Sequence, residues 1–227
     1  MIYEVLKKNK HVMEYDEEAD IIKKSDIVHL LRQAWDITPS KNNIMAWQVF
    51  VIGPDNQNYK NAVYDICSEN EDRSNRKNKN ADVDKTIGRK PAYANIKSCQ
   101  YLLIITQRLG GPLNGYQQRQ WDKGIFYDPC TEDGLVSSRE NIAVECGIFG
   151  ANFRALAIER GIDTSFTANF KKDSGHPNYD LSDWKKLPFV NRRVNLIMTI
   201  GHGKKYRNQP KEFHDPKPNF GTIVKWV

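Results

Sequence analysis

Three short, continuous apolar runs stand out along the chain. They occupy residues 49–52, 101–106 and 194–201. Apolar runs of this length without alternation predict strands that are buried on both faces. Gly53 and Pro54 end the first run, as expected at the end of a strand. Because predicted helices separate the three runs, the pattern indicates helices layered on a sheet.

Apolar residues at helical spacing predict a helix over residues 25–36, whose apolar face would carry Val28, Leu31 and Trp35. Pro39 provides the stop signal. The same spacing predicts a second helix over about residues 58–69.

The longest predicted helix runs from Ser137 to Gly161 and begins with a capping box formed by Ser137 and Glu140. Two sets of residues recur along it: an apolar stripe, Ile142, Cys146, Phe149, Phe153 and Leu156, and a ridge of small residues, Ala143, Gly147, Ala151 and Ala155. Each glycine inside a helix costs about 1 kcal/mol relative to alanine, so tight packing should offset it. The helix could lie at the centre of a domain or across a dimer axis, although an ordinary core helix would also fit.

Five small or polar residues, Pro39 to Asn43, precede the first predicted strand, more than a turn requires. We expect this run at a sheet edge. Ser40, Asn42 and Asn43 are neutral hydrogen-bonding groups, which suit a cofactor that brings its own reactivity. A hydrated turn between helix and strand is the alternative interpretation.

The chain length of 227 residues suits a single domain over residues 1–227. No secretory or membrane-spanning pattern is expected, and four cysteines without CxxC spacing fit a reducing cytosol. Residues 68–85 are almost free of apolar side chains and predict a mobile surface loop. The net charge of +6 fits an anionic cofactor, ordinary solubility or nucleic acid, the last through residues 73–97.

Several kinds of active site find no support in the sequence. No Gly-rich phosphate or dinucleotide loop has the required spacing, and the five histidines form no HxxxH or HExxH pair. No GxSxG motif is present either. Residue chemistry alone therefore predicts no hydrolase and no metal site.

The order of motifs resembles that of the nitroreductase family of FMN-dependent NAD(P)H oxidoreductases. The resemblance rests on four segments, which together span most of the chain: residues 8–18, 39–47, 149–170 and 201–227. It implies an α+β, three-layer fold with a central, mostly antiparallel sheet flanked by helices. It also implies a domain-swapped homodimer, in which the tail of about residues 203–227 crosses to the partner and FMN lies in a groove between the subunits.

The resemblance further implies which residues would hold FMN. Lys8, Lys10 and His11 would meet the phosphate, assisted by Lys205 or Lys217 from the tail. Because lysine lacks the bidentate fork of arginine, this clamp differs from the arginine-rich motif typical of the family.

Other positions would surround the flavin ring and the ribityl chain. Pro39, Ser40 and Asn43 would line them from the other subunit, and Arg89 or Lys90 would lie at the pyrimidine edge.

The backbone of Thr167, Ala168 and Asn169 would approach N5 of the flavin. Residues 110–134 could form a lid, with aromatic candidates at Tyr116, Trp121, Phe126 and Tyr127, or a surface loop anchored by aromatic residues.

The implied activity is ping-pong transfer of hydride from NAD(P)H through flavin to a nitroaromatic, a quinone or a related acceptor, without a catalytic side chain. Met13 and Asn9 replace family arginines and motivate a second hypothesis, a flavin- or nucleotide-binding protein of the same fold without efficient turnover. A third, nucleic-acid binding, would require retention of oligonucleotides that falls with salt.

Overall fold

The structure is a computed structural model of the chain. It describes residues 11–75, 93–108, 114–124, 139–168, 170, 184–190 and 192–206. All structural statements concern these residues.

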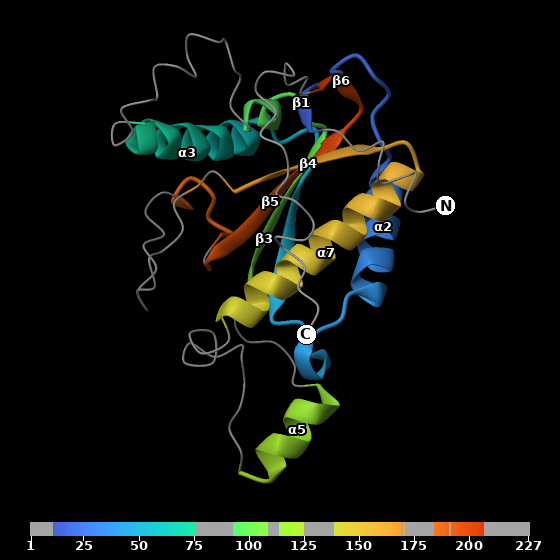
Figure 1. The fold of residues 1–227 in the computed structure, drawn as a ribbon, viewed down its shortest axis with the longest axis vertical. Helices are drawn as coiled ribbons and strands as arrows, with labels where there is room; N and C mark the ends of the chain where they lie inside the picture. Colours follow the sequence, from blue (N-terminus) through green and yellow to red (C-terminus); the bar gives the residue numbers. More distant parts are fainter. Residues whose placement is uncertain are drawn as a thin grey trace, which may run out of the picture.

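A four-stranded sheet forms the centre of the fold (Figure 1). Its strands follow the order β2-β3-β5-β4, and every neighbouring pair is antiparallel. The bounds are Trp47–Ile52 for β2, Tyr101–Gln107 for β3, Asp163–Thr167 for β4 and Val194–Gly201 for β5. β2 and β4 are therefore the two edge strands.

The central strand β3 shows why the sheet is covered on both faces. All seven of its residues are buried. Leu103 and Ile105 pack into one apolar cluster, whereas Leu102 and Ile104 pack into another on the opposite face. A continuous apolar run is what such a two-sided position requires.

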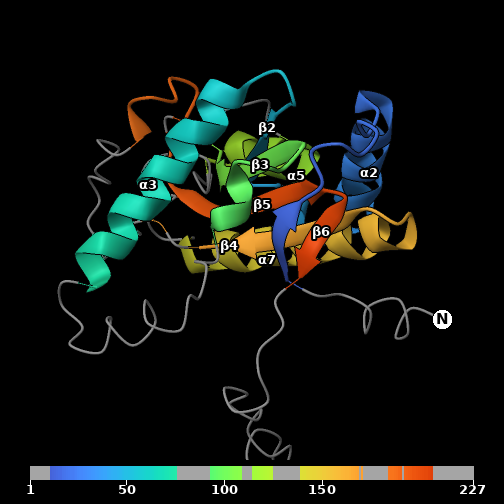
Figure 2. The same cartoon turned by 90° about the horizontal axis from the view of Figure 1, so that it is seen from above.

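Helices form the two outer layers (Figure 2). One face is covered by α2, Lys24–Ile37, and α7, Arg139–Glu159, which pack against each other. The other face is covered by α3, Gln57–Asn75, by the short 3₁₀ helix η2, Ala94–Ile96, and by residues 184–190. This arrangement confirms the expected α+β, three-layer fold.

Two smaller elements lie outside these layers. The 3₁₀ turn η1, Lys41–Asn43, directly precedes β2, and the helix α5, Gly115–Asp122, lies apart from the helices that cover the sheet (Figure 1).

A second, two-stranded ladder is docked onto the main sheet. It pairs β1, Val12–Tyr15, with β6, Gly203–Tyr206, so residues 203–206 bond to their own chain. The fully buried Tyr15 hydroxyl donates to the carbonyl oxygen of Thr199 at 2.9 Å. A Cβ at Gly201 would lie 2.7 Å from the Tyr15 ring, so only glycine permits this approach.

Three sequence predictions about individual elements are wrong in part. The run 49–52 forms a strand, but β2 is an edge strand and Val51 is 43% exposed, so it is not buried on both faces. Val28 and Trp35 lie on the exposed side of α2. Residues 68–75 belong to α3 and not to a loop. The rest of the predicted loop, residues 76–85, lies outside the described residues.

Candidate functional site

The polar run between α2 and β2 has an unusual backbone. Asn42, Asn43 and Met45 have φ angles of 55°, 59° and 51°. This left-handed region is unfavourable for residues with a Cβ, and asparagine tolerates it best among them. Such strain persists only where the surroundings hold it, and it concentrates at ligand sites. The conformation explains why the chain carries two asparagines in succession here.

Side chains from other elements hold this loop, which we call the 38–46 loop after its residues. The Ser40 hydroxyl accepts a hydrogen bond from the Met45 backbone N–H at 2.8 Å. The Lys41 N–H donates to Oε1 of Glu145, on α7, at 2.8 Å. Glu145 is only 9% exposed, and its Oε2 finds no donor among the described residues. The loop is thereby fixed to the helical layer.

Two further side chains bind carbonyl oxygens of the 38–46 loop. Nδ2 of Asn114, the N-cap of α5, donates to the carbonyl oxygens of Asn42 at 3.0 Å and Asn43 at 2.9 Å. Arg108, just beyond β3, donates through Nε to the Met45 carbonyl at 2.9 Å and through Nη2 to the Ile44 carbonyl at 2.8 Å.

This bonding uses backbone groups of the loop, so the side chains of Asn42 and Asn43 remain at its surface. Pro39, Lys41, Asn42 and Asn43 are exposed, and Ser40 is half-buried. A rigid backbone that displays small polar groups can bind a ligand with little ordering cost. The structure thus brings together the predicted residues Pro39, Ser40 and Asn43 on one preorganised loop.

A second group of predicted residues gathers at the opposite edge of the sheet. Thr167 ends β4, and the exposed Ala168 follows it. The ladder lies beside β4: the backbone N–H of Val12 on β1 donates to the hydroxyl of Ser165 on β4 at 2.8 Å. His11 directly precedes this ladder.

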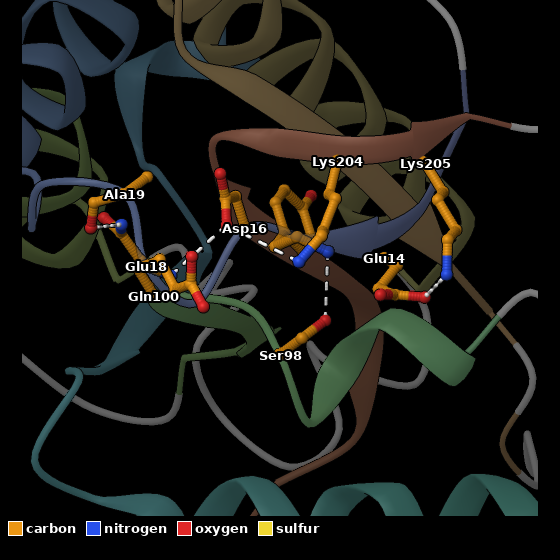
Figure 3. Close-up of polar contacts among 9 residues, drawn as sticks. Glu14, Asp16, Glu18, Ala19, Ser98, Gln100, Lys204 and Lys205 are labelled. Atoms are coloured by element: carbon orange, nitrogen blue, oxygen red, sulfur yellow. Dashed lines mark hydrogen bonds and ion pairs between the residues drawn. The ribbon is translucent and has the colours of Figure 1, made fainter.

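Lys205 lies on β6, and in this chain its Nζ donates to Oε2 of Glu14 at 2.9 Å (Figure 3). Lys204 lies 3.9 Å from Asp16 on the same ladder (Figure 3). Both lysines are largely exposed, so these pairs contribute little to stability and leave the ammonium groups within reach of an anion.

Asp163 ties the ladder to β4. Its Oδ2 accepts the Tyr206 hydroxyl at 3.0 Å and the Gly203 N–H at 2.9 Å. Burial, followed by the bond to Asp163 and its charge, raises the pKa of Tyr206. The phenol therefore stays a neutral donor at physiological pH.

The two groups do not meet within one chain. The 38–46 loop precedes β2, whereas the ladder lies beside β4, and these strands are the two edges of the sheet. Three inter-strand spacings separate the edges, or about 14 Å.

Several predicted site residues lie outside the described residues: Lys8, Lys10, Arg89, Lys90, Asn169 and Lys217. Of the candidate lid, residues 110–134, the structure describes 114–124, which contain α5 with Trp121 exposed.

Sequence reasoning missed the three residues that hold the 38–46 loop. Glu145 is an acid at a buried position of the long helix, and this mismatch is a usable signal. Asn114, followed by Gln117, matches a helix-capping pattern. Arg108 carried no comparable signal, because a basic residue after a strand is common.

The described residues contain no group of His, Cys, Asp or Glu that could hold a metal ion. Cys67, Cys99 and Cys146 are free and buried, and burial raises the pKa of each thiol to about 12. These thiols are therefore poor nucleophiles. None of the described helices has the length and apolar character needed to cross a membrane.

A family model described as "Nitroreductase family" matches residues 14–202. No curated protein matches the chain at the sequence level.

Several solved structures share the fold. A BluB-like flavoprotein from Clostridium difficile 630 is 16% identical with a TM-score of 0.63, and the match covers 100% of this chain and 99% of that one. A nitroreductase-like protein from Streptococcus mutans is 15% identical with a TM-score of 0.59, covering 99% and 97%. An oxidized iodotyrosine deiodinase bound to FMN and 3-iodo-L-tyrosine is 16% identical with a TM-score of 0.61, covering 100% and 99%.

Proposed function

The chain belongs to the nitroreductase family, and on that premise we propose that it is an FMN-dependent oxidoreductase that works as a homodimer. When bound, FMN supplies the redox chemistry, taking hydride from NAD(P)H and passing electrons to a nitroaromatic, a quinone or a related acceptor. The protein supplies position and electrostatics.

The observation that carries the proposal is the 38–46 loop, which we call the flavin loop from here on. Its backbone polar groups are bound by Glu145, Asn114 and Arg108, and its exposed side chains are small and polar. These are the groups that a flavin ring edge and a ribityl chain would need. FMN in the iodotyrosine deiodinase structure, which has the same fold, supports this choice of cofactor.

The phosphate end of FMN would be held at the β4 edge. Lys205 lies on the ladder there and His11 directly precedes it, and Thr167 and Ala168 stand at the end of the adjacent strand β4. The ammonium of Lys205 would exchange its exposed partner Glu14 for a phosphate oxygen, and the backbone at Ala168 would face the ring.

A second copy of the chain would complete the site. The flavin loop precedes the edge strand β2, whereas the ladder lies beside the other edge strand, β4. In a homodimer, the loop of one protomer would meet the ladder of its partner.

The surface of the protomer supports the dimer as well. Val144 on α7 is 61% exposed, and Trp35 and Ile37 on α2 are 52% and 56% exposed. The small residues Ala143, Gly147 and Ala151 lie on the same exposed side of α7 as Val144. A large apolar surface on neighbouring helices indicates an interface.

The absorbance spectrum of the purified protein tests the proposal. We expect a flavin spectrum, bleaching by NADH or NADPH without oxygen, recovery on addition of menadione or nitrofurazone, and a dimeric mass by light scattering. A yellow protein that oxidises neither nucleotide would favour the alternative, a flavin-binding protein of this fold without efficient turnover. A colourless monomer that takes up no added FMN would refute both.

A further inference from the structure

Asn114 links two elements that the proposed function uses separately. It precedes α5, which carries Tyr116 and Trp121, two of the four aromatic candidates of the lid, and it also contacts the flavin loop. All of its side-chain polar groups are used. Oδ1 accepts the Gln117 N–H at 2.8 Å, and Nδ2 donates to two loop carbonyls, those of Asn42 and Asn43.

The chemistry of this junction specifies asparagine. Helix capping needs a side-chain acceptor, which Asn, Asp or Ser can provide. The loop carbonyls need two N–H donors at the same side chain. Among the good N-cap residues, only asparagine combines an acceptor oxygen with an NH₂ group. A residue that only capped the helix would not need the NH₂ group.

The contact falls on a left-handed part of the loop backbone. Asn42 and Asn43 both have positive φ angles, and their carbonyl oxygens are the two that Asn114 binds. Loss of these bonds would release the peptide units that set the direction of the Asn43 side chain. The capping box at Asn114 and Gln117 fixes the start of α5 at the same time.

On the premise of the proposed function, we infer that Asn114 is a positioning residue. Its side chain couples the binding of FMN at the flavin loop to the order of α5. FMN that fixes the loop also fixes the anchor of α5. By linkage, an acceptor that orders α5 strengthens FMN binding by the same factor.

Asn114→Asp separates the two roles of the side chain. Aspartate keeps the capping acceptor, and its charge suits a helix N-terminus. It cannot donate, and it sets a carboxylate against two carbonyl oxygens. Asn114→Ser keeps a cap but has no donor that reaches both carbonyls. Gln118→Ala is the matched control, because it removes an exposed bond to Asp122 within α5 and touches no loop residue.

The experiment measures FMN affinity by flavin fluorescence and amide exchange of residues 40–46 and 115–122, with and without FMN. We expect FMN affinity to fall about tenfold in Asn114→Asp and Asn114→Ser, as the loss of two hydrogen bonds predicts, and to stay unchanged in Gln118→Ala. In the wild type, FMN should slow exchange in 115–122, and Asn114→Asp should abolish that effect. Without FMN, exchange at 43–45 should be faster in Asn114→Asp.

Wild-type FMN affinity in Asn114→Asp, or an equal loss in Gln118→Ala, would overturn the inference while leaving the proposed function intact. The inference would also be overturned if, in the absence of FMN, amide exchange at residues 43–45 were the same in Asn114→Asp as in the wild type. A wild-type chain that binds no FMN would instead refute the proposed function.

Discussion

The carboxylate of Glu145 on α7 accepts the backbone N–H of Lys41 at 2.8 Å, across a sequence separation of 104 residues. Hydrogen bonds to charged groups contribute about 1.5–3 kcal/mol, and the unpaired Oε2 offsets part of this. We expect Glu145→Ala to raise the FMN dissociation constant about tenfold, the equivalent of about 1.4 kcal/mol, with little change in melting temperature.

Glu145→Gln keeps an acceptor oxygen and should recover most of that affinity. Glu159→Ala, at an exposed position near the end of the same helix, serves as the control and should bind FMN as the wild type does. If Glu145→Ala and the wild type bind FMN with equal affinity, the hydrogen bond from Lys41 to Glu145 does not hold the loop in its FMN-binding conformation.

Ser40 and Asn43 should affect flavin retention for different reasons. The Ser40 hydroxyl accepts the Met45 N–H, so Ser40→Ala disturbs the shape of the loop. The Asn43 side chain is exposed and is proposed to contact FMN directly. The double variant Ser40→Ala with Asn43→Ala should lose flavin on gel filtration while its far-UV circular dichroism stays unchanged.

Asn43→Gly isolates the ligand contact, because glycine tolerates the φ of 59° that alanine does not. It should lose flavin without the loop strain that an alanine adds. Retention of stoichiometric flavin in the double variant would show that the cofactor site lies elsewhere.

Two glycines of α7 provide a matched test of the dimer. Among the described residues of one protomer, a Cβ at Gly147 would meet nothing within 4 Å, whereas a Cβ at Gly150 would lie 2.8 Å from Leu196 Cδ2. Gly147→Leu should therefore leave the protomer folded but halve the mass measured by light scattering, and flavin should be lost with the second copy. Gly150→Leu should lower the melting temperature, because it overpacks the core. A Gly147→Leu variant that remains a flavin-loaded dimer would place the interface on another surface.

The structure confirms the elements that the pattern of apolar residues predicts most clearly. Residues 101–106 and 194–201 could form only buried strands, and the buried positions of α7 include four of the five residues of its predicted stripe. In contrast, α2 carries two apolar stripes offset by one residue. The buried one contains Ile27, Leu30 and Ala34, and the other contains Val28 and Trp35. Helical periodicity alone cannot choose between them.

The loop could be located from sequence, but its supports could not. The run of residues 39–43 before an apolar strand indicated a displayed turn, and positive φ angles at Asn42 and Asn43 agree with the preference of asparagine. Glu145 and Asn114 lie 104 and 71 residues from the loop positions that they bind. Contacts over such sequence separations depend on how the helices pack. The local pattern of apolar and polar residues does not encode that packing.

The buried Lys60 provides a test of the structure that needs no ligand. Its side chain is 2% exposed, and Nζ donates to the Cys99 carbonyl at 2.8 Å. Desolvation lowers the pKa of Lys60 below its model-compound value of 10.5, against smaller opposite effects of Cys99, Asp55 and Glu17. Between the folded-state pKa and 10.5 the unfolded chain binds more protons than the folded chain, so stability from this group rises with pH.

Lys60→Met removes the titration and keeps an unbranched side chain. We expect the free energy of unfolding of the wild type to rise relative to that of Lys60→Met as the pH increases from 7 toward 10.5, measured by urea denaturation. Buried thiols and phenols, whose pKa values are raised, titrate in both proteins and cancel in the difference. If the difference stays constant with pH, or falls, the Lys60 ammonium keeps its charge at no cost, and the buried position of its side chain on α3 is wrong.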